Sequence, residues 1–226
     1  MDSLTPSPTL IDQTYGALLA AICEGRLQPG ERLNQDEIAA RLRISRQPVG
    51  QALSILKAQG FVRDTGRRGL IVAPLEREFF RAIYQLREAL DPMAARLAAE
   101  RCSAGDIADA RKLLAEGKAA VESGAIAALI AADMSFHMWI YQVAGNPLAL
   151  DTMRLYWNHL RRAMGEVLRD APRRSTVWSE HEQILQSIID GDGDAAAQHA
   201  LRHARDAATR VAESLPATQA RAAAGQ

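Results

Sequence analysis

The 226-residue chain is poor in cysteine and contains no long apolar run. Its two cysteines, Cys23 and Cys102, lie far apart and match no metal-binding or disulfide spacing, so we expect both to be reduced. No uninterrupted apolar run reaches the roughly 20 residues that a membrane-spanning helix needs. The apolar stretch from Tyr15 to Cys23 follows Asp2 and Asp12 rather than the basic residues of a signal peptide. These absences predict a cytoplasmic protein without a membrane anchor.

The chain also lacks net charge, because 27 Lys and Arg residues balance 27 Asp and Glu residues. The charge is nevertheless unevenly distributed: residues 26–68 contain nine basic and four acidic residues, an excess of five positive charges. The rest of the chain must carry the matching negative excess. A basic segment on an acidic body is expected when one part of a protein binds a polyanion, although a solvated charged surface gives the same count.

The basic segment has the pattern of a helix-turn-helix. After a loose arm over residues 1–9, apolar spacing predicts a first helix that begins at Leu10 and ends at Gly25. Asn34 and Ser45 are typical N-cap residues, and each precedes a short amphipathic helix, the second of which ends near Gly60. Two strand-like runs with a glycine-bearing turn follow at residues 61–74 and predict a β-hairpin, or wing.

The predicted contacts with double-stranded DNA lie in the second of these short helices and in the wing. Arg46 and Gln47 stand at the N-terminal end of the helix, where a recognition helix enters the major groove. Ser45 and the neighbouring backbone amides can hold a phosphate. Arg67 and Arg68 lie at the wing tip, within reach of a phosphate or the minor groove. The alternative from the residues alone is a surface helix with a capping serine and an incidental arginine.

Beyond Pro74 the sequence predicts an all-helical bundle, so the whole chain is expected to be mainly α. Ala, Leu, Arg and Glu dominate this part, and strand patterns are almost absent. Breaks at glycine and proline predict six helices, over residues 76–102, 104–123, 125–143, 147–170, 174–190 and 193–214. Residues 215–226 lack an apolar face and are predicted to form a flexible tail.

The motifs of both parts resemble those of the GntR family of bacterial transcription regulators. Residues 10–74 contain LQPGERLNQDEIAARLRISRQPVGQAL, AQGFV and RRGLIVAP, and are similar to the winged-helix domain of that family. Residues 76–214 contain YQLREALDPMAARLAAER, DMSFH, AGNPL, EHEQIL and GDGDAAAQHALRHARD, and resemble the all-helical effector domain (FCD) of its FadR-type branch. The resemblance implies a winged helix-turn-helix DNA-binding domain followed by an effector-binding helical bundle.

Two positions depart from the family pattern. Gly50, in PVGQ, stands where the family commonly has an arginine one turn into the recognition helix, and Asp36 stands where a basic residue is frequent. A glycine within a helix costs about 1 kcal/mol relative to alanine and offers no side chain to DNA. The operator sequence of other family members therefore does not predict the DNA sequence that this chain binds.

Histidine and aspartate residues of the predicted bundle form a candidate metal site. Asp133 and His137 are spaced i,i+4 and share a helix face, which fits either a side-chain hydrogen bond or a metal ion such as zinc or nickel. The family resemblance implies that Asp133, His137, His181 and His203 together bind a divalent metal. His199 has no counterpart in that set and is expected to be a neighbour or surface residue.

Other residues of the bundle have less specific predictions. His159, in LYWNHLRR, is predicted to face outward, whereas four aromatic residues are predicted to belong to the core or to a pocket wall: Trp139, Tyr141, Trp157 and Trp178. Four protein ligands would leave two positions free on a six-coordinate metal, enough for a small carboxylate effector. Arg87 is the leading candidate for pairing with that carboxylate, and Arg161 or Arg162 could add to it.

The sequence thus predicts a ligand-responsive transcriptional regulator, a repressor that binds operator DNA as a homodimer and senses a small organic acid at a metal site. Two alternatives stay open at this point. The bundle could be a metal-dependent enzyme, although no extra general base accompanies the four ligands. The regulator could also hold a purely structural metal in a closed pocket.

Overall fold

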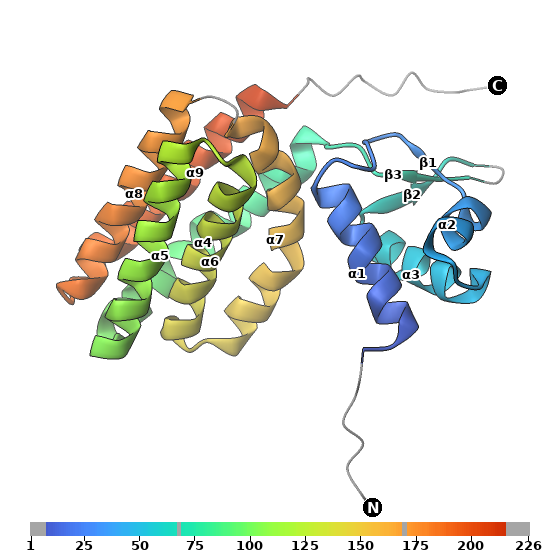
Figure 1. Cartoon of the computed structure of the whole chain (residues 1–226). Helices are drawn as coiled ribbons and strands as arrows, with labels where there is room; N and C mark the ends of the chain where they lie inside the picture. The colour runs from blue at the N-terminus through green and yellow to red at the C-terminus, as the bar shows by residue number, and fades with distance from the viewer. Residues whose placement is uncertain (1–7, 67–68, 169–170, 216–226) are drawn as a thin grey trace, which may run out of the picture. The chain divides into compact units, whose positions relative to one another are not determined.

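The computed structural model describes residues 8–66, 69–168 and 171–215. The chain divides between Leu75 and Glu76 into two compact units. We call the first unit the head and the second the bundle. Figure 1 shows that the head combines short helices with a small sheet, whereas the described part of the bundle contains only helices.

Three helices form most of the head: α1 (Leu10–Cys23), α2 (Gln35–Leu42) and α3 (Arg46–Ala58). Thr9 and Asp12 form a reciprocal capping box at the start of α1, and the Asn34 side chain accepts hydrogen bonds from the first turn of α2. Ser45 occupies the N-cap position of α3, but its side chain makes no capping hydrogen bond. The inward faces of α2 and α3 pack with α1 around fully buried residues such as Val49 and Leu53.

The tight turn between α2 and α3 places the two helices in the predicted helix-turn-helix arrangement. Arg43 follows α2 with a φ of 55°, a left-handed conformation that ends the helix without glycine. Two residues later Ser45 precedes α3, so the connection is short. The N-cap residues and the apolar spacing together therefore predicted this motif correctly.

The wing is an antiparallel hairpin of β2 (Val62–Asp64) and β3 (Leu70–Val72), as predicted. A strand that the sequence did not predict, β1 (Arg32–Leu33), pairs with the other edge of β3 and gives the order β1-β3-β2. Two residues are too few to show a strand period, which explains why β1 was missed. Arg67 and Arg68 lie outside the described residues.

Six long helices form the bundle in the described residues, with bounds close to those predicted: α4 (Arg77–Arg101), α5 (Ala104–Ser123), α6 (Ile126–Ala144), α7 (Pro147–Val167), α8 (Ala171–Ile189) and α9 (Gly193–Ser214). The first and last of these pack side by side over much of their length, and α6 lies against α4, α5 and α7 (Figure 1). The result is a helical bundle whose interior receives side chains from α4, α6, α7, α8 and α9.

Among the described residues, α6 is the one helix with the length and apolar composition of a membrane span. Its buried residues include Asp133 and His137, and neighbouring helices of the bundle pack against it. These features are typical of the core helix of a bundle.

A glycine in α5 allows α8 to approach closely. A Cβ atom on Gly117 would lie 1.5 Å from Cζ2 of Trp178, so no larger residue fits beneath this ring. The Trp178 indole N–H donates to the carbonyl of Leu114 at 2.8 Å. Trp178 in turn packs against His181, with ring centroids 4.8 Å apart. Gly117 therefore helps to position a histidine of the candidate metal site.

Candidate functional site

Four buried side chains from three helices meet in the interior of the bundle. Asp133 and His137 come from α6, His181 from α8 and His203 from α9, and each is at most 3% exposed. The three histidines each offer a ring nitrogen, and these nitrogens all lie within 4.8 Å of one another. Oδ1 of Asp133 lies 3.4 Å from Nε2 of His181 and 4.0 Å from Nε2 of His137. We call these four residues the His/Asp cluster.

The geometry of the His/Asp cluster fits a divalent metal ion. Nε2 of His137 and Nε2 of His203 are 3.2 Å apart, and two nitrogens bound tetrahedrally to one zinc ion lie about 3.3 Å apart. Both ring nitrogens of His181 are buried without a hydrogen-bond partner. Buried polar atoms are almost always satisfied, so the residues present here, an imidazole with no protein partner facing a carboxylate and two other imidazoles, fit a metal ion.

A second layer of charged residues orients His203. Oε2 of Glu180 lies 2.7 Å from Nδ1 of His203, so the imidazole donates its Nδ1 proton to this carboxylate and turns Nε2 toward the cluster. Two guanidinium nitrogens of Arg210 donate to Glu180, each at 2.8 Å. Burial alone would raise the pKa of Glu180, but the hydrogen bonds from His203 and Arg210 lower it to about 2.

Burial also sets the charge of the cluster. It lowers the pKa of His137 and of His181 well below the usual histidine value, and lowers that of His203, because a charged imidazole would lose its hydration. The same burial raises the pKa of Asp133 to about 7. The three imidazoles are therefore neutral near pH 7, which is the form that binds a divalent metal.

Arg87 of α4 reaches the edge of the cluster. One Nη atom lies 3.4 Å from Nε2 of His137 and can donate to it. The guanidinium also donates to Asp91, at 2.9 and 2.8 Å, and the hydroxyl of Tyr141 donates to the other oxygen of Asp91 at 2.5 Å. The rings of Tyr84 and Trp157 each lie 5.3 Å from the guanidinium carbon. Arg87 is thus a fixed, buried cation beside the His/Asp cluster.

The space next to the cluster is small. A cavity of about 20 Å³ is lined by two arginines, two cluster residues and several apolar side chains: Arg87, Arg210, Asp133, His203, Tyr84, Met164, Val167, Leu168, Val177, Ala207 and Val211. Such a volume holds about one water molecule. An organic carboxylate would therefore need the lining side chains to move.

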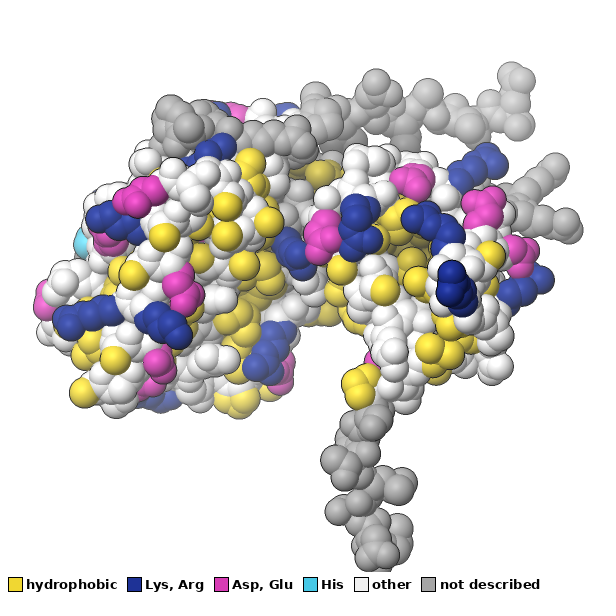
Figure 2. Space-filling view, viewed as in Figure 1, with side chains coloured by type: hydrophobic (Ala, Val, Ile, Leu, Met, Phe, Trp, Pro, Cys, Tyr) yellow, Lys and Arg dark blue, Asp and Glu magenta, His cyan; other side chains and the backbone are white. Residues whose placement is uncertain are grey.

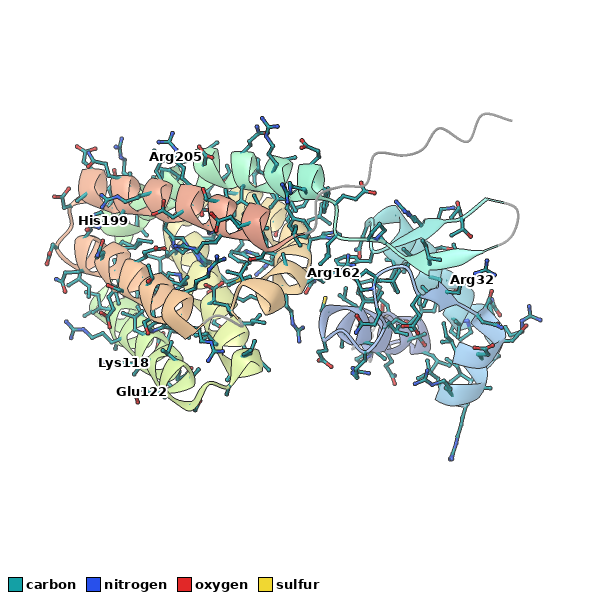
Figure 3. The ribbon with its side chains drawn as sticks, turned by 90° about the horizontal axis from the view of Figure 1, so that it is seen from above. Arg32, Lys118, Glu122, Arg162, His199 and Arg205 are labelled. Carbon is teal, nitrogen blue, oxygen red and sulfur yellow. The ribbon has the colours of Figure 1, made fainter. Side chains whose placement is uncertain are left out.

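The other predicted effector residues lie elsewhere on the bundle. Arg161 is half-buried and Arg162, which Figure 3 labels, is buried. Neither residue lines this cavity. His199, also labelled in Figure 3, is half-buried and donates from Nδ1 to the carbonyl of Gln183 at 3.1 Å. It joins α9 to α8 and does not belong to the cluster.

The prediction that His159 faces outward is wrong. Its side chain is buried, with 2% exposure, and its ring meets that of Phe79 edge-to-face at a centroid distance of 4.8 Å. The polar residues around it in the sequence obscured its position on the inward face of α7, next to the buried Leu160. Four aromatic residues were predicted to belong to the core or a pocket wall, and all are buried: Trp139, Tyr141, Trp157 and Trp178. Two of them, Trp157 and Trp178, pack against histidines of the cluster.

In the head, the predicted DNA-contacting residues of α3 are accessible. Ser45, Arg46 and Gln47 are exposed at the start of the helix. Nε of Arg46 forms an ion pair with Oδ1 of Asp36 at 2.6 Å. On the face of the head seen in Figure 2, basic side chains lie beside acidic ones rather than in a continuous positive patch.

Each of the two units matches a known protein family. Residues 10–72 match the profile of the bacterial regulatory proteins of the gntR family, and residues 82–206 match that of the FCD domain. The chain belongs to the GntR family. This GntR-family chain is 33% identical over 178 residues to the Nta operon transcriptional regulator of Aminobacter aminovorans, a match that covers 78% of the chain and 82% of that protein.

Other relatives of this GntR-family protein are also regulators. It is 24% identical over 208 residues to the transcriptional repressor RspR of Escherichia coli K12, covering 92% of the chain and 91% of RspR. The structure of E. coli McbR/YncC has the same fold, with a TM-score of 0.78 at 20% identity over 91% of this chain and 98% of that one. The families and relatives are transcription regulators, so the enzyme alternative is not supported.

Three residues that the structure adds to the site of this GntR-family protein were not predicted: Asp91, Glu180 and Arg210. Each had a signal in the sequence. Asp91 follows Arg87 by four residues, a helical ion-pair spacing, and Glu180 directly precedes His181. Arg210 follows His203 by two helical turns. These spacings are common on solvated helices, so only the packed bundle shows that they serve one site.

Proposed function

We propose that this GntR-family regulator is a homodimeric, cytoplasmic repressor whose DNA binding responds to a small carboxylate at a metal centre formed by Asp133, His137, His181 and His203. The observation that carries the proposal is the buried His/Asp cluster with an orphaned imidazole and a fixed arginine, Arg87, at its edge. Relatives named as repressors support the direction of control.

In this proposal the chain's own residues do most of the binding. Zinc or nickel suits three imidazoles and a carboxylate, and when bound it would supply open coordination positions for the carboxylate oxygens of an effector. Arg87 offers the complementary positive charge, and Asp91 and Tyr141 hold it in place. Arg210 lines the same cavity and is a second candidate, whereas Arg161 remains a prediction from the sequence.

In the head, α3 is the proposed recognition helix. Arg46 and Gln47 would face base edges in the major groove, Ser45 a phosphate, and Arg67 and Arg68 of the wing the adjacent backbone or minor groove. A homodimer would place two such helices about one helical turn apart on near-palindromic operator DNA. Effector binding can change DNA affinity only if the effector prefers one arrangement of the regulator over another.

Metal content and effector response test the proposal together. Elemental analysis of the purified full chain should find about one zinc or nickel ion per chain, and His203→Ala should lose it. His199→Ala is the matched control, because His199 lies one turn away on α9 and outside the cluster. Gel shifts with acetate or succinate, before and after chelation, then show whether the response needs the metal. Retention of the ion by His203→Ala would refute the site.

The small cavity supports a second candidate, in which the metal is structural. With space for about one water, the bundle as described would seal the ion from an effector. Chelation would then lower the melting temperature of the bundle but leave any carboxylate response of DNA binding unchanged.

A further inference from the structure

Two consecutive residues of α2 contact the first turn of the proposed recognition helix. Nε2 of Gln35 donates to the backbone carbonyl of Arg46 at 2.6 Å, and the carboxylate of Asp36 pairs with the Arg46 side chain at 2.6 Å. Both contacts join one helix of the helix-turn-helix to the other. The start of α3 is therefore held at its backbone by Gln35 and at its first side chain by Asp36.

Gly50 provides the space for this arrangement. A Cβ atom on Gly50 would lie 2.8 Å from Nε2 of Gln35, closer than real contacts allow. In this arrangement the Gln35 side chain lies over the bare backbone at Gly50, and a larger residue there would have to displace the end of that side chain. The same first turn lacks a second arginine, so Arg46 is the basic residue that α3 presents there.

The atoms of the ion pair decide what remains free on Arg46. The shortest approach of the Asp36 carboxylate is to Nε of the guanidinium. A guanidinium has one N–H on Nε and two on each Nη, so an acceptor at Nε leaves N–H groups on the Nη atoms for another partner. Two such donors match the O6 and N7 acceptors of one guanine in the major groove. A carboxylate on Nε therefore fixes the direction of the side chain without blocking the edge that reads a base.

We propose that Asp36 is a positioning residue for operator recognition, which holds Arg46 so that it reads a guanine in each half-site. The inference rests on the proposed docking of α3 in the major groove. Both side chains are exposed, at 69% for Arg46 and 62% for Asp36, so the pair adds little to folding stability. Its effect is to order a flexible side chain before DNA binds and to place a negative charge that disfavours non-specific contact with phosphates.

The test is a comparison of base preference, not of affinity alone. Full-length wild-type protein is used to select duplexes from a random pool at fixed salt, and the affinities of variants are then measured for the selected duplex and its single-base changes. Arg46→Ala should reduce discrimination at one guanine by about 5- to 150-fold. Asp36→Ala should reduce discrimination at that same guanine by about 2- to 10-fold, while binding to unrelated duplexes rises.

A matched control separates positioning from simple charge removal. Glu24 is another exposed carboxylate of the head that is paired with an arginine, Arg26, at 2.8 Å. Glu24→Gln removes one negative charge and should leave the guanine preference intact. In the double variant Asp36→Ala with Arg46→Ala, the effect of Asp36→Ala on discrimination should disappear, because Asp36 acts through Arg46.

The outcomes distinguish the inference from the function on which it rests. If Asp36→Ala keeps the guanine preference and merely binds all duplexes more tightly, Asp36 is only a negative charge and the inference is overturned. If Arg46→Ala changes neither affinity nor base preference, α3 is not the recognition helix and the proposed docking fails as well. Circular dichroism of each variant verifies that the head remains folded.

Discussion

Replacing His181 by phenylalanine should stabilise the metal-free bundle and destabilise it relative to wild type when metal is present. Both ring nitrogens of His181 are buried without a hydrogen-bond partner, and the ring stacks on Phe136 at a centroid distance of 4.5 Å. A phenyl ring keeps this stacking and removes the two unsatisfied polar groups. It also removes a proposed metal ligand.

The structure allows the magnitude to be worked out. Each buried unsatisfied polar group costs about 1–3 kcal/mol, and the extra volume of a phenyl ring in a packed core costs about 1–3 kcal/mol. The first effect exceeds the second by about 1–3 kcal/mol, so without metal His181→Phe should be more stable than the wild type by that amount. Zinc at a thousandfold excess over its dissociation constant would add about 4.1 kcal/mol to the wild type alone, which reverses the order.

Thermal unfolding followed by tryptophan fluorescence is the suitable assay. All three tryptophans, Trp139, Trp157 and Trp178, lie in the bundle, so their emission reports this unit and not the head. For a unit of this size, 1 kcal/mol shifts the melting temperature by about 2–4 °C. The variant should melt above the wild type in chelator and below it in zinc.

Two results would refute this reasoning. A variant that melts below the wild type in chelator would show that the polar atoms of His181 are satisfied in solution. An equal rise in melting temperature on adding zinc to both proteins would show that the ion binds elsewhere. His181→Leu, whose volume is nearer that of histidine, serves as a second variant if phenylalanine overfills the site.

Three further substitutions test the surroundings of the cluster. Glu180→Gln should weaken metal affinity by about 10- to 100-fold in titration calorimetry, because an amide oxygen accepts the hydrogen bond from Nδ1 of His203 more weakly than a carboxylate does. Gly117→Ala should destabilise the bundle by at least about 1–3 kcal/mol in urea, with a shifted fluorescence maximum as Trp178 is displaced. Arg87→Met should cost about 3–5 kcal/mol by leaving the buried charge of Asp91 without its ion-pair partner, and adding Asp91→Asn should recover most of it. Changes within experimental error would contradict each argument in turn.

The fold was predictable because its signals are local and repeated. Caps such as Asn34, glycine and proline breaks, and apolar spacing marked every helix of the head and bundle in the described residues to within a few positions. The strand β1 could not be predicted, since it exists only by pairing with β3 across the head. The burial of His159 was missed for a related reason: its contact, Phe79, lies on another helix.

The candidate site was less accessible to sequence reasoning. Spacing could pair Asp133 with His137, but it could not bring His181 and His203 to the same point, because three helices must first pack around one centre. The family resemblance supplied that grouping as an expectation. Glu180 and Arg210, which orient His203, come together only through tertiary packing. Neither residue stands out in the sequence among the many possible ion pairs of a helical protein.

The size of the cavity bears on how a carboxylate at the cluster could control the head. A space of about 20 Å³ cannot admit an organic acid without displacement of apolar side chains such as Met164 or Val177. Tightly packed interiors rearrange between discrete alternatives rather than deform continuously, so an effector that binds here must select a second packing of α7, α8 or α9. The difference in effector affinity between the two packings is then the free energy available for regulation, typically about 1–3 kcal/mol. If the proposed sensing operates at this site, the second packing must therefore differ from the one described at lining residues such as Met164 and Val177.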